Sequence, residues 1–355
     1  MIRLAIIGTG NMATWHADSF SKIKGVRLVA CCDAVKAKAQ EFAEKWKIPA
    51  VYGDYREMLA RETLDAVSVV TTDAAHAAAA IAAAKKGLHV MCEKPLATSV
   101  AEGRRMLAAV RKAGVIHMVN FSYRNSSGLQ AAAKVVAAGR IGRVIHVESS
   151  YLQSWLVSQV WGDWRKSPNL LWRLSSRHGS LGTLGDIGCH ILDMTAFLGG
   201  EIDRIACQLK TFDKGVKGNR IDDYVFDVND SFAATVGFAG GGLGAIHSSR
   251  WACGHLNSLR ARVYGDKGGI EVDLDRDGSG YRICSGREAV EKGLWKEVKC
   301  PPTPNNYQRF IRSIRTGRPD PSDFANGLKV QTYLHCCVAS DRAGKPVRVG
   351  AGERK

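Results

Sequence analysis

The first 120 residues alternate short apolar runs with helical segments, and this alternation constrains the fold more than any other feature of the chain. Runs that predict strands lie at residues 3–7, 26–32, 50–52, 65–71, 89–92 and 116–120. Segments that predict helices lie at residues 11 to about 24, 36–47, 55–61, 74–86 and 100–112. Strands that alternate with helices favour a parallel sheet with right-handed crossovers. The N-terminal part is therefore predicted to be a doubly wound α/β domain.

A glycine turn follows the first predicted strand and opens the first predicted helix. Its sequence is Gly8-Thr9-Gly10-Asn11-Met12-Ala13. Gly8 permits the tight turn, Gly10 lets the backbone approach a pyrophosphate, and the helix N-terminus favours anions. This pattern predicts a dinucleotide site. The residues predicted to contact the dinucleotide at the turn are Gly8, Gly10, Asn11 and Met12.

The second predicted strand ends at Asp33, where a carboxylate would accept from the ribose hydroxyls of the dinucleotide. Its charge would repel the 2′-phosphate of NADP, so we expect NAD to be preferred, although Lys36 and Lys38 lie nearby. The alternative is an ordinary glycine turn with a surface aspartate. Ligands of parallel sheets bind beyond the carboxyl ends of the strands. Further cofactor contacts are therefore predicted at the ends of the fourth and fifth strands, at Thr71, Thr72, Glu93 and Lys94.

Four motifs carry a resemblance to a known family. They are Glu93-Lys94-Pro95, residues 182–193 (G-T-L-G-D-I-G-C-H-I-L-D), residues 139–144 and residues 264–269. With them the chain resembles, essentially end to end, the glucose-fructose oxidoreductase, inositol dehydrogenase and rhizopine catabolism (Gfo/Idh/MocA) family. The resemblance implies a Rossmann domain at residues 1–122 and an α+β domain at residues 123–355 with a large open, mostly antiparallel sheet. It also implies an NAD-dependent oxidoreductase that acts on a secondary alcohol of a sugar, sugar derivative or cyclitol, and a homodimer or homotetramer.

Oxidation of a secondary alcohol requires a group that takes up the hydroxyl proton. Asp186 and His190 are four residues apart on a helix predicted to begin near Leu184, so they share one face. The resemblance implies a catalytic set in which Lys94 orients the substrate and stabilises the oxyanion, His190 exchanges the proton and Asp186 binds the hydroxyl. It implies a peripheral or structural Asp193 and a cis bond between Lys94 and Pro95.

Other interpretations of these residues remain open. Asp186 and His190 also fit a helix N-terminal carboxylate with a core histidine, or a metal pair, but a metal site needs three or more ligands and none is predicted. His76 takes the place of a family histidine near the nicotinamide, but Thr72-Asp73 replaces the family's Pro-Asn, so a structural role for His76 is equally open. Tyr123 and Arg124 resemble a domain-junction element. Asn120 is a weaker candidate for the active site.

The second half of the chain has longer alternating runs, which predict a mostly antiparallel sheet. The expected strands are residues 144–152, 202–212, 230–238, 242–250, 258–264 and 269–274, and helices are expected at residues 305–316 and 323–339. Residues 155–177 hold four tryptophans and three arginines. They predict a substrate-covering loop in which Trp164, Arg165 and Trp172 bind the sugar, because aromatic faces suit C–H groups and arginine suits an acidic substituent. The alternative is that these tryptophans pack at the domain junction.

Composition excludes several classes of protein. The net charge is +16, but Lys and Arg are scattered rather than grouped in a basic run, so no nucleic-acid partner is expected. No apolar run approaches the roughly 20 residues of a membrane helix, and the ten cysteines form no C-x-x-C motif and are expected to be reduced thiols. A cytoplasmic protein is predicted. Two other functions fit the same pattern: an NAD-dependent glycosidase or eliminase that oxidises its substrate transiently, and a non-catalytic dinucleotide sensor.

Overall fold

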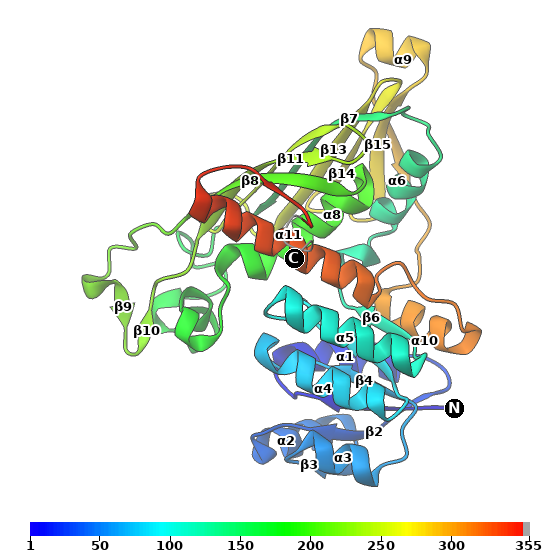
Figure 1. The fold of residues 1–355 in the computed structure, drawn as a ribbon, viewed down its shortest axis with the longest axis vertical. Coiled ribbons are helices and arrows are strands. Elements are labelled where there is room, and N and C mark those ends of the chain that lie inside the picture. Colours follow the sequence, from blue (N-terminus) through cyan, green and yellow to red (C-terminus); the bar gives the residue numbers. More distant parts are fainter. Residues whose placement is uncertain (351–355) are drawn as a thin grey trace. The chain divides into compact units, whose positions relative to one another are not determined.

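The computed structural model describes residues 1–350 (Figure 1). They divide into two compact units. The first unit holds Met1–Ser122 and Pro304–Gln331, and the second holds Tyr123–Thr303 and the chain from Thr332 onward. The break after Ser122 coincides with the predicted boundary. Residues 304–331 lie in the second domain that the resemblance implies, whereas in the structure they group with the first unit.

The first unit is built on a six-stranded parallel sheet with the order β3-β2-β1-β4-β5-β6. Its strands are β1 (Ile2–Ile7), β2 (Val26–Cys32), β3 (Ala50–Tyr52), β4 (Ala66–Val69), β5 (His89–Cys92) and β6 (His117–Val119). The crossover helices are α1 (Asn11–Ser21), α2 (Lys36–Trp46), α3 (Tyr55–Arg61), α4 (Asp73–Lys85) and α5 (Val100–Ala113). The strand order reverses between β1 and β4, which is where such sheets bind dinucleotides. The predicted doubly wound sheet is confirmed.

Helix α10 (Asn306–Thr316) returns to the first unit because its apolar face completes that unit's core. Tyr307, Phe310 and Ile311 are buried in one cluster with Phe20 of α1 and Phe42 of α2. A capping box begins the helix: the Asn305 side chain accepts from the backbone of Gln308, and the Gln308 side chain accepts from the backbone of Asn305. The sequence predicts this helix, but the surface that receives it is more than 200 residues away along the chain.

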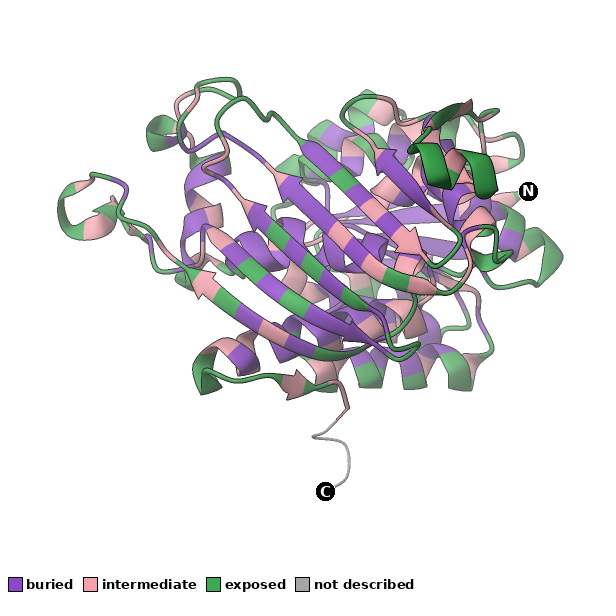
Figure 2. Cartoon of the chain, turned by 90° about the horizontal axis from the view of Figure 1, so that it is seen from above, coloured by how far each residue is buried: buried purple, intermediate pink, exposed green. Residues whose placement is uncertain are grey.

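The second unit contains a nine-stranded sheet with the order β16-β15-β14-β13-β7-β12-β11-β8-β17. Its strands are β7 (Val144–Leu152), β8 (Ile202–Lys210), β11 (Ser231–Phe238), β12 (Leu243–Ser249), β13 (Ser258–Gly265), β14 (Gly268–Asp273), β15 (Gly280–Ser285), β16 (Lys296–Lys299) and β17 (Val347–Arg348). Only the β12–β7 pair among them is parallel. Buried and exposed residues alternate along the strands, as Figure 2 shows, so one face packs inward and the other is open. The predicted open, mostly antiparallel sheet is confirmed.

Helices α6 (Ser127–Ala137) and α8 (Cys189–Gly199) also belong to the second unit, as does the last part of α11 (Phe324–Ala343). The sequence pattern leaves several elements of this unit unpredicted: α6, α9 (Arg287–Lys292), the strands β15 to β17, and the hairpin of β9 (Arg220–Ile221) and β10 (Tyr224–Val225). Most of these elements are short. They carry too few residues for a periodic pattern to be distinctive.

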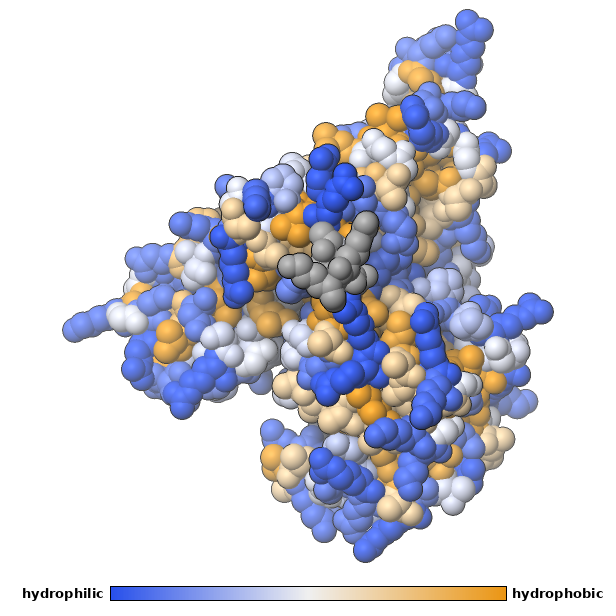
Figure 3. Space-filling view, in the orientation of Figure 1, coloured by the Kyte–Doolittle hydropathy of each residue, from blue (hydrophilic) through white to orange (hydrophobic). Residues whose placement is uncertain are grey.

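No helix among residues 1–350 is both long enough and apolar enough to cross a membrane. On the face of the molecule shown in Figure 3, hydrophilic residues are interspersed with smaller hydrophobic patches.

Candidate active site

The glycine turn of the first unit has the backbone of an anion site. Gly8 has a φ of +92°, and a Cβ there would lie 2.6 Å from the Val70 carbonyl oxygen, so glycine is required. A Cβ on Gly10 would meet no other atom of the protein within 4 Å, so the backbone there faces open space. Helix α1 begins after Gly10 without a side-chain cap and without an acidic residue in its first turn. Its first N–H groups are therefore left for an external anion.

Asp33, at the end of β2, is tied to this turn. Its Oδ2 accepts hydrogen bonds from the backbone nitrogen of Thr9 at 2.8 Å and from the Thr9 hydroxyl at 3.0 Å. Its Oδ1 accepts from the backbone nitrogen of Val35 at 2.9 Å. The carboxylate is half-buried, so it both braces the turn and remains within reach of a ligand. The sequence does not predict the bracing contact.

The other residues predicted to contact the cofactor differ in exposure. Exposed residues are Gly10, Asn11, Met12 and Thr72, whereas Thr71 is half-buried and Gly8 is buried. His76 is fully buried, and its two ring nitrogens face the carbonyl oxygens of Pro95 at 2.9 Å and Thr71 at 3.2 Å. These contacts favour the structural role that the sequence analysis left open for His76, and its cofactor contact stays a prediction.

Lys94 follows β5 at the carboxyl edge of the same sheet and is half-buried. Its bond to Pro95 is cis, which confirms the prediction. The neighbouring Glu93 is buried and points into the unit: its Oε1 meets His16 at 2.8 Å and Asn120 at 2.6 Å. The Glu93 side chain is engaged inside the unit, and the cofactor contact predicted for Glu93 stays a prediction.

Asp186 lies in the second unit, in a single π-helical turn, Leu184–Gly188, that runs into α8. Turns of this kind are frequent at functional sites. The glycines around Asp186 are required by packing, since a Cβ on Gly188 would lie 2.9 Å from the Phe232 ring. Two guanidinium groups hold the Asp186 carboxylate: Arg250 Nη2 at 3.0 Å and Arg173 Nε at 3.4 Å.

Arg250 is the contact that the sequence analysis misses. It is fully buried at the end of β12, lies over the Trp155 ring, and donates from Nη1 to the Arg173 carbonyl oxygen. The Arg250 side chain is 0% exposed and that of Asp186 is 21% exposed, so the carboxylate is anchored from inside with one side toward the surface. An arginine as the last residue of the strand predicted at residues 242–250 is the sequence signal that could have suggested this pairing.

His190 packs against two tyrosines of the same unit. The Tyr123 ring meets the imidazole edge-on with a centroid distance of 4.9 Å, and the Tyr151 ring lies 6.3 Å away. The two phenol oxygens are hydrogen-bonded to each other, Tyr151 donates to Asn257 Oδ1 at 2.7 Å, and Asn257 Nδ2 donates to Tyr123 at 2.8 Å. These three side chains form a closed ring of hydrogen bonds beside His190, which the sequence analysis does not predict.

Asp193, one turn beyond His190, is buried and paired with Arg124. Two of the three guanidinium nitrogens donate to the carboxylate: Arg124 Nε to Asp193 Oδ2 and Arg124 Nη2 to Asp193 Oδ1, each at 2.7 Å. The Arg124 guanidinium also lies over the Phe197 ring of α8. This geometry supports the structural role predicted for Asp193, and it ties the segment after Ser122 to the helix that carries His190.

The tryptophan-rich segment is mostly a small core of its own. Trp155 and Trp164 are 1% and 2% exposed and pack in a cluster with Leu156, Leu174 and Phe226. The buried Trp164 ring donates to the Leu156 carbonyl oxygen and is a core residue, so the burial of its ring speaks against the sugar contact predicted for it. Of the predicted substrate residues in this segment, Trp172 is half-buried and Arg165 is exposed and stacked on Trp164. Trp155 and Trp164 thus pack inside the second unit, and the alternative that these tryptophans pack at the domain junction stays open.

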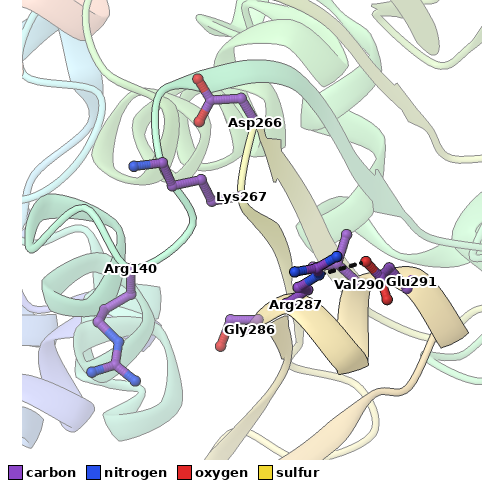
Figure 4. Close-up of a pocket in the computed structure, with 8 residues that line it drawn as sticks. Arg140, Asp266, Lys267, Gly286, Arg287, Val290 and Glu291 are labelled. Atoms are coloured by element: carbon purple, nitrogen blue, oxygen red, sulfur yellow. Dashed lines mark hydrogen bonds and ion pairs between the residues drawn. The ribbon is translucent and has the colours of Figure 1, made fainter.

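A surface groove of about 580 Å³ lies elsewhere on the second unit. Figure 4 shows its rim, where Arg287 pairs with Glu291 of the same helix at 2.9 Å. Both side chains of this pair are largely exposed, and the groove holds none of the predicted site residues. Across residues 1–350, no three His, Cys, Asp or Glu side chains gather as a set of metal ligands.

Lys94 belongs to the first unit, and Asp186 and His190 belong to the second. The structure therefore describes two halves of the predicted catalytic set, each with its own supporting contacts. That the three side chains act on one substrate oxygen stays a prediction.

Two family models match the chain. Residues 2–121 match the model described as "Oxidoreductase family, NAD-binding Rossmann fold", and residues 129–271 match "GFO/IDH/MocA C-terminal domain". Both assign the chain to the same group of proteins.

Individual relatives agree with this assignment. The levoglucosan dehydrogenase of Pseudarthrobacter phenanthrenivorans is 29% identical over 78% of this chain and 74% of its own length. The D-glucoside 3-dehydrogenase of Escherichia coli is 30% identical over 68% of each chain. Among solved structures, levoglucosan dehydrogenase in complex with NADH and levoglucosan superposes with a TM-score of 0.87 at 25% identity, covering 98% of this chain and 99% of the other.

Proposed function

Since the chain belongs to the Gfo/Idh/MocA family of NAD-binding oxidoreductases, we propose that it oxidises a secondary alcohol of a sugar, a sugar derivative or a cyclitol. Relatives whose names identify them as levoglucosan, D-glucoside and myo-inositol dehydrogenases support this substrate class. One observation carries the proposal. Lys94 follows β5 at the carboxyl edge of the parallel sheet, and the uncapped glycine turn before α1 lies at the same edge.

The residues of the first unit fit NAD. The open backbone at Gly10 and the free first N–H groups of α1 would hold the pyrophosphate, and Asp33 would accept from the adenosine ribose hydroxyls. When bound, NAD takes the hydride that the substrate carbon loses. The exposed positions Asn11, Met12 and Thr72 would line the cofactor, and Thr71 would lie next to them.

The chain's own side chains would handle the proton and the oxygen of the alcohol. Lys94 would donate a hydrogen bond to the reacting oxygen and stabilise the negative charge that develops there. His190 would take the hydroxyl proton, since imidazole titrates near neutrality. Asp186, held in place by Arg250 and Arg173, would accept a hydrogen bond from a substrate hydroxyl.

The substrate would also meet the segment before the π-helical turn. Trp172 is half-buried and Arg165 is exposed, so both remain available to a sugar. The Arg165 guanidinium stacks on the buried Trp164 ring. Arg173 is committed to Asp186. Arg165 is therefore the candidate for recognising an acidic substituent.

We further propose a cytoplasmic homodimer or homotetramer. Ten free cysteines within the described residues suit a reducing compartment. The open face of the nine-stranded sheet offers a surface for a second copy of the chain. The molar mass measured by light scattering tests whether the protein is a dimer or a tetramer.

The function is tested by following NADH absorbance with anhydrosugars, inositols, aldoses, glycosides and uronates. We expect NADH to accumulate with at least one neutral polyol or anhydrosugar. Cleavage of a glycoside without net NADH would favour the glycosidase or eliminase alternative. NAD binding without turnover on the entire set would favour the sensor.

A further inference from the structure

A cluster of buried polar side chains in the first unit includes the residue before Lys94. Its members lie on α1 and β4 and directly after β5 and β6. His16 of α1, Ser68 of β4, Glu93 and Asn120 make up this cluster, which we call the Glu93 cluster. His16 Nδ1 lies 2.7 Å from the Ser68 hydroxyl, and its Nε2 lies 2.8 Å from Glu93 Oε1. Asn120 Nδ2 donates to the same Glu93 oxygen at 2.6 Å. The cluster thus connects the helix behind the glycine turn with the strand end that carries Lys94.

The second oxygen of Glu93 serves Lys94 itself. The backbone nitrogen of Lys94 donates to Glu93 Oε2 at 3.2 Å. Asn120 is held in turn by Asn306, whose Nδ2 donates to Asn120 Oδ1 at 2.9 Å and to the Phe121 carbonyl oxygen at 3.0 Å. Both oxygens of the Glu93 carboxylate therefore accept hydrogen bonds. The donors to Oε1, His16 and Asn120, are themselves held by Ser68 and Asn306.

Glu93 carries a negative charge at working pH although it is only 6% exposed. Burial raises its pKa, but the hydrogen bonds from His16 and Asn120 and the charges of His16 and Lys94 lower it, to about 2. The other titratable groups that face Glu93 are Cys92 on β5 and Tyr307 on α10, and burial raises the pKa of both, so they stay neutral. The Glu93 carboxylate is thus a permanent charge next to Lys94.

We propose that Glu93 is a positioning residue that fixes the backbone at Lys94 and stabilises the ammonium form of its side chain. This inference rests on the proposed function, in which Lys94 meets the reacting oxygen. A lysine could serve such a reaction either as a neutral base or as a cationic donor. A fixed negative charge next to it stabilises the cationic donor. The hydroxyl proton must then pass to another group, for which His190 is the candidate.

The alternative is that the cluster only holds α1 against the sheet. A purely structural cluster would change stability when altered, but it would not change the titration of Lys94. The titration of Lys94 therefore separates the two, and it can be measured without a substrate.

The experiment labels the full-length protein with acetic anhydride over a range of pH and follows Lys94 by peptide mass spectrometry. In the unaltered protein we expect the midpoint of labelling at or above that of the exposed Lys112. In Glu93→Gln, which keeps the shape and removes the charge, we expect the midpoint to fall by about one pH unit. In Glu93→Asp, which keeps the charge, the fall should be smaller.

Ser68→Ala is the matched control, because it removes the outer hydrogen bond of His16 and leaves the Glu93 charge in place. We expect the Lys94 midpoint to stay unchanged in it. A midpoint near neutrality in the unaltered protein would overturn the proposal even if Glu93→Gln did not fold. An unchanged midpoint in a folded Glu93→Gln would overturn it as well. Failure of the proposed function has a different signature, because no sugar would then be oxidised while the labelling shift would remain.

Discussion

Replacement of Asp33 by Asn tests how the first unit selects its cofactor. Asp33 accepts two hydrogen bonds from Thr9 and one from the backbone nitrogen of Val35. An asparagine keeps an acceptor oxygen for Thr9 and removes the charge. We therefore expect the glycine turn to survive while the preference for NADH over NADPH weakens.

The size of the effect follows from two terms. A carboxylate and a phosphate about 6 Å apart at a protein surface repel each other by roughly 1–2 kcal/mol, which is about tenfold in affinity for NADPH. A hydrogen bond from the ribose to a charged acceptor is worth about 1.5–3 kcal/mol and one to a neutral acceptor about 0.5–1.5 kcal/mol. The difference of roughly 1–1.5 kcal/mol should weaken NADH binding to the variant about tenfold. Together the ratio of the two dissociation constants should change by a factor on the order of 10².

Fluorescence titration of NADH and NADPH measures both constants without a sugar substrate. Asp33→Ser is the comparison variant: serine is too short to reach Thr9, so its Tm should fall further than that of Asp33→Asn. Lys36→Ala, which removes an exposed nearby cation, should weaken NADPH binding alone. Equal affinity of the unaltered protein for the two cofactors, or an unchanged ratio in Asp33→Asn, would refute the reasoning.

Further predictions concern the catalytic and supporting residues. Lys94→Met should lower kcat by a factor on the order of 10² or more with NADH affinity retained, and near-normal turnover would exclude a central role for Lys94. His190→Asn should lower kcat by 10² to 10⁴, on the order expected for a positioned acid or base, and flatten the pH–rate limb near neutrality; an unfolded variant would instead identify His190 as a core residue. Asp193→Asn should destabilise the second unit by about 3–5 kcal/mol in urea unfolding, because it removes the carboxylate charge that pairs with the buried Arg124, and a loss below 1 kcal/mol would contradict this. The pKa of Glu93 in the folded protein, about 2, lies below its ordinary value of 4.5, so its contribution of about 3 kcal/mol is complete above pH 4.5 and is lost as the pH falls toward 2. The stability difference between the unaltered protein and Glu93→Gln should therefore shrink between pH 6 and pH 3, where the unfolded chain takes up the proton, and a constant difference would show that folding leaves the pKa of Glu93 unchanged.

The fold could be predicted from local patterns to a large extent. Alternating strands and helices in the first 120 residues and period-two runs in the second half are each properties of a short stretch of sequence. The turn at Gly8 is similarly local, because a φ of +92° is a backbone conformation that favours glycine. Shorter elements such as β16 and β17 carry too few residues for such a pattern.

The residues of the candidate site also differ in how far the sequence could predict them. Lys94, Asp186 and His190 were found from motifs, and each stands at the end of a strand or at the start of a helix, where sequence spacing is informative. Trp164 was predicted from its chemistry alone, and its exposure depends on what the rest of the segment packs against it. Chemistry identifies what a side chain is able to bind, but only packing decides whether it faces a ligand.

The sequence by itself thus determined the layer architecture, the glycine turn, the cofactor class and the motif residues, because neighbours along the chain impose these. Tertiary structure alone decided that α10 completes the first core, that Arg250 anchors Asp186 from 64 positions away, and that His16 meets Glu93 across 77 positions. The reason is physical: a buried charge or apolar face is stabilised by whichever partner the folded chain brings to it, and the identity of that partner is not encoded in the residues beside it.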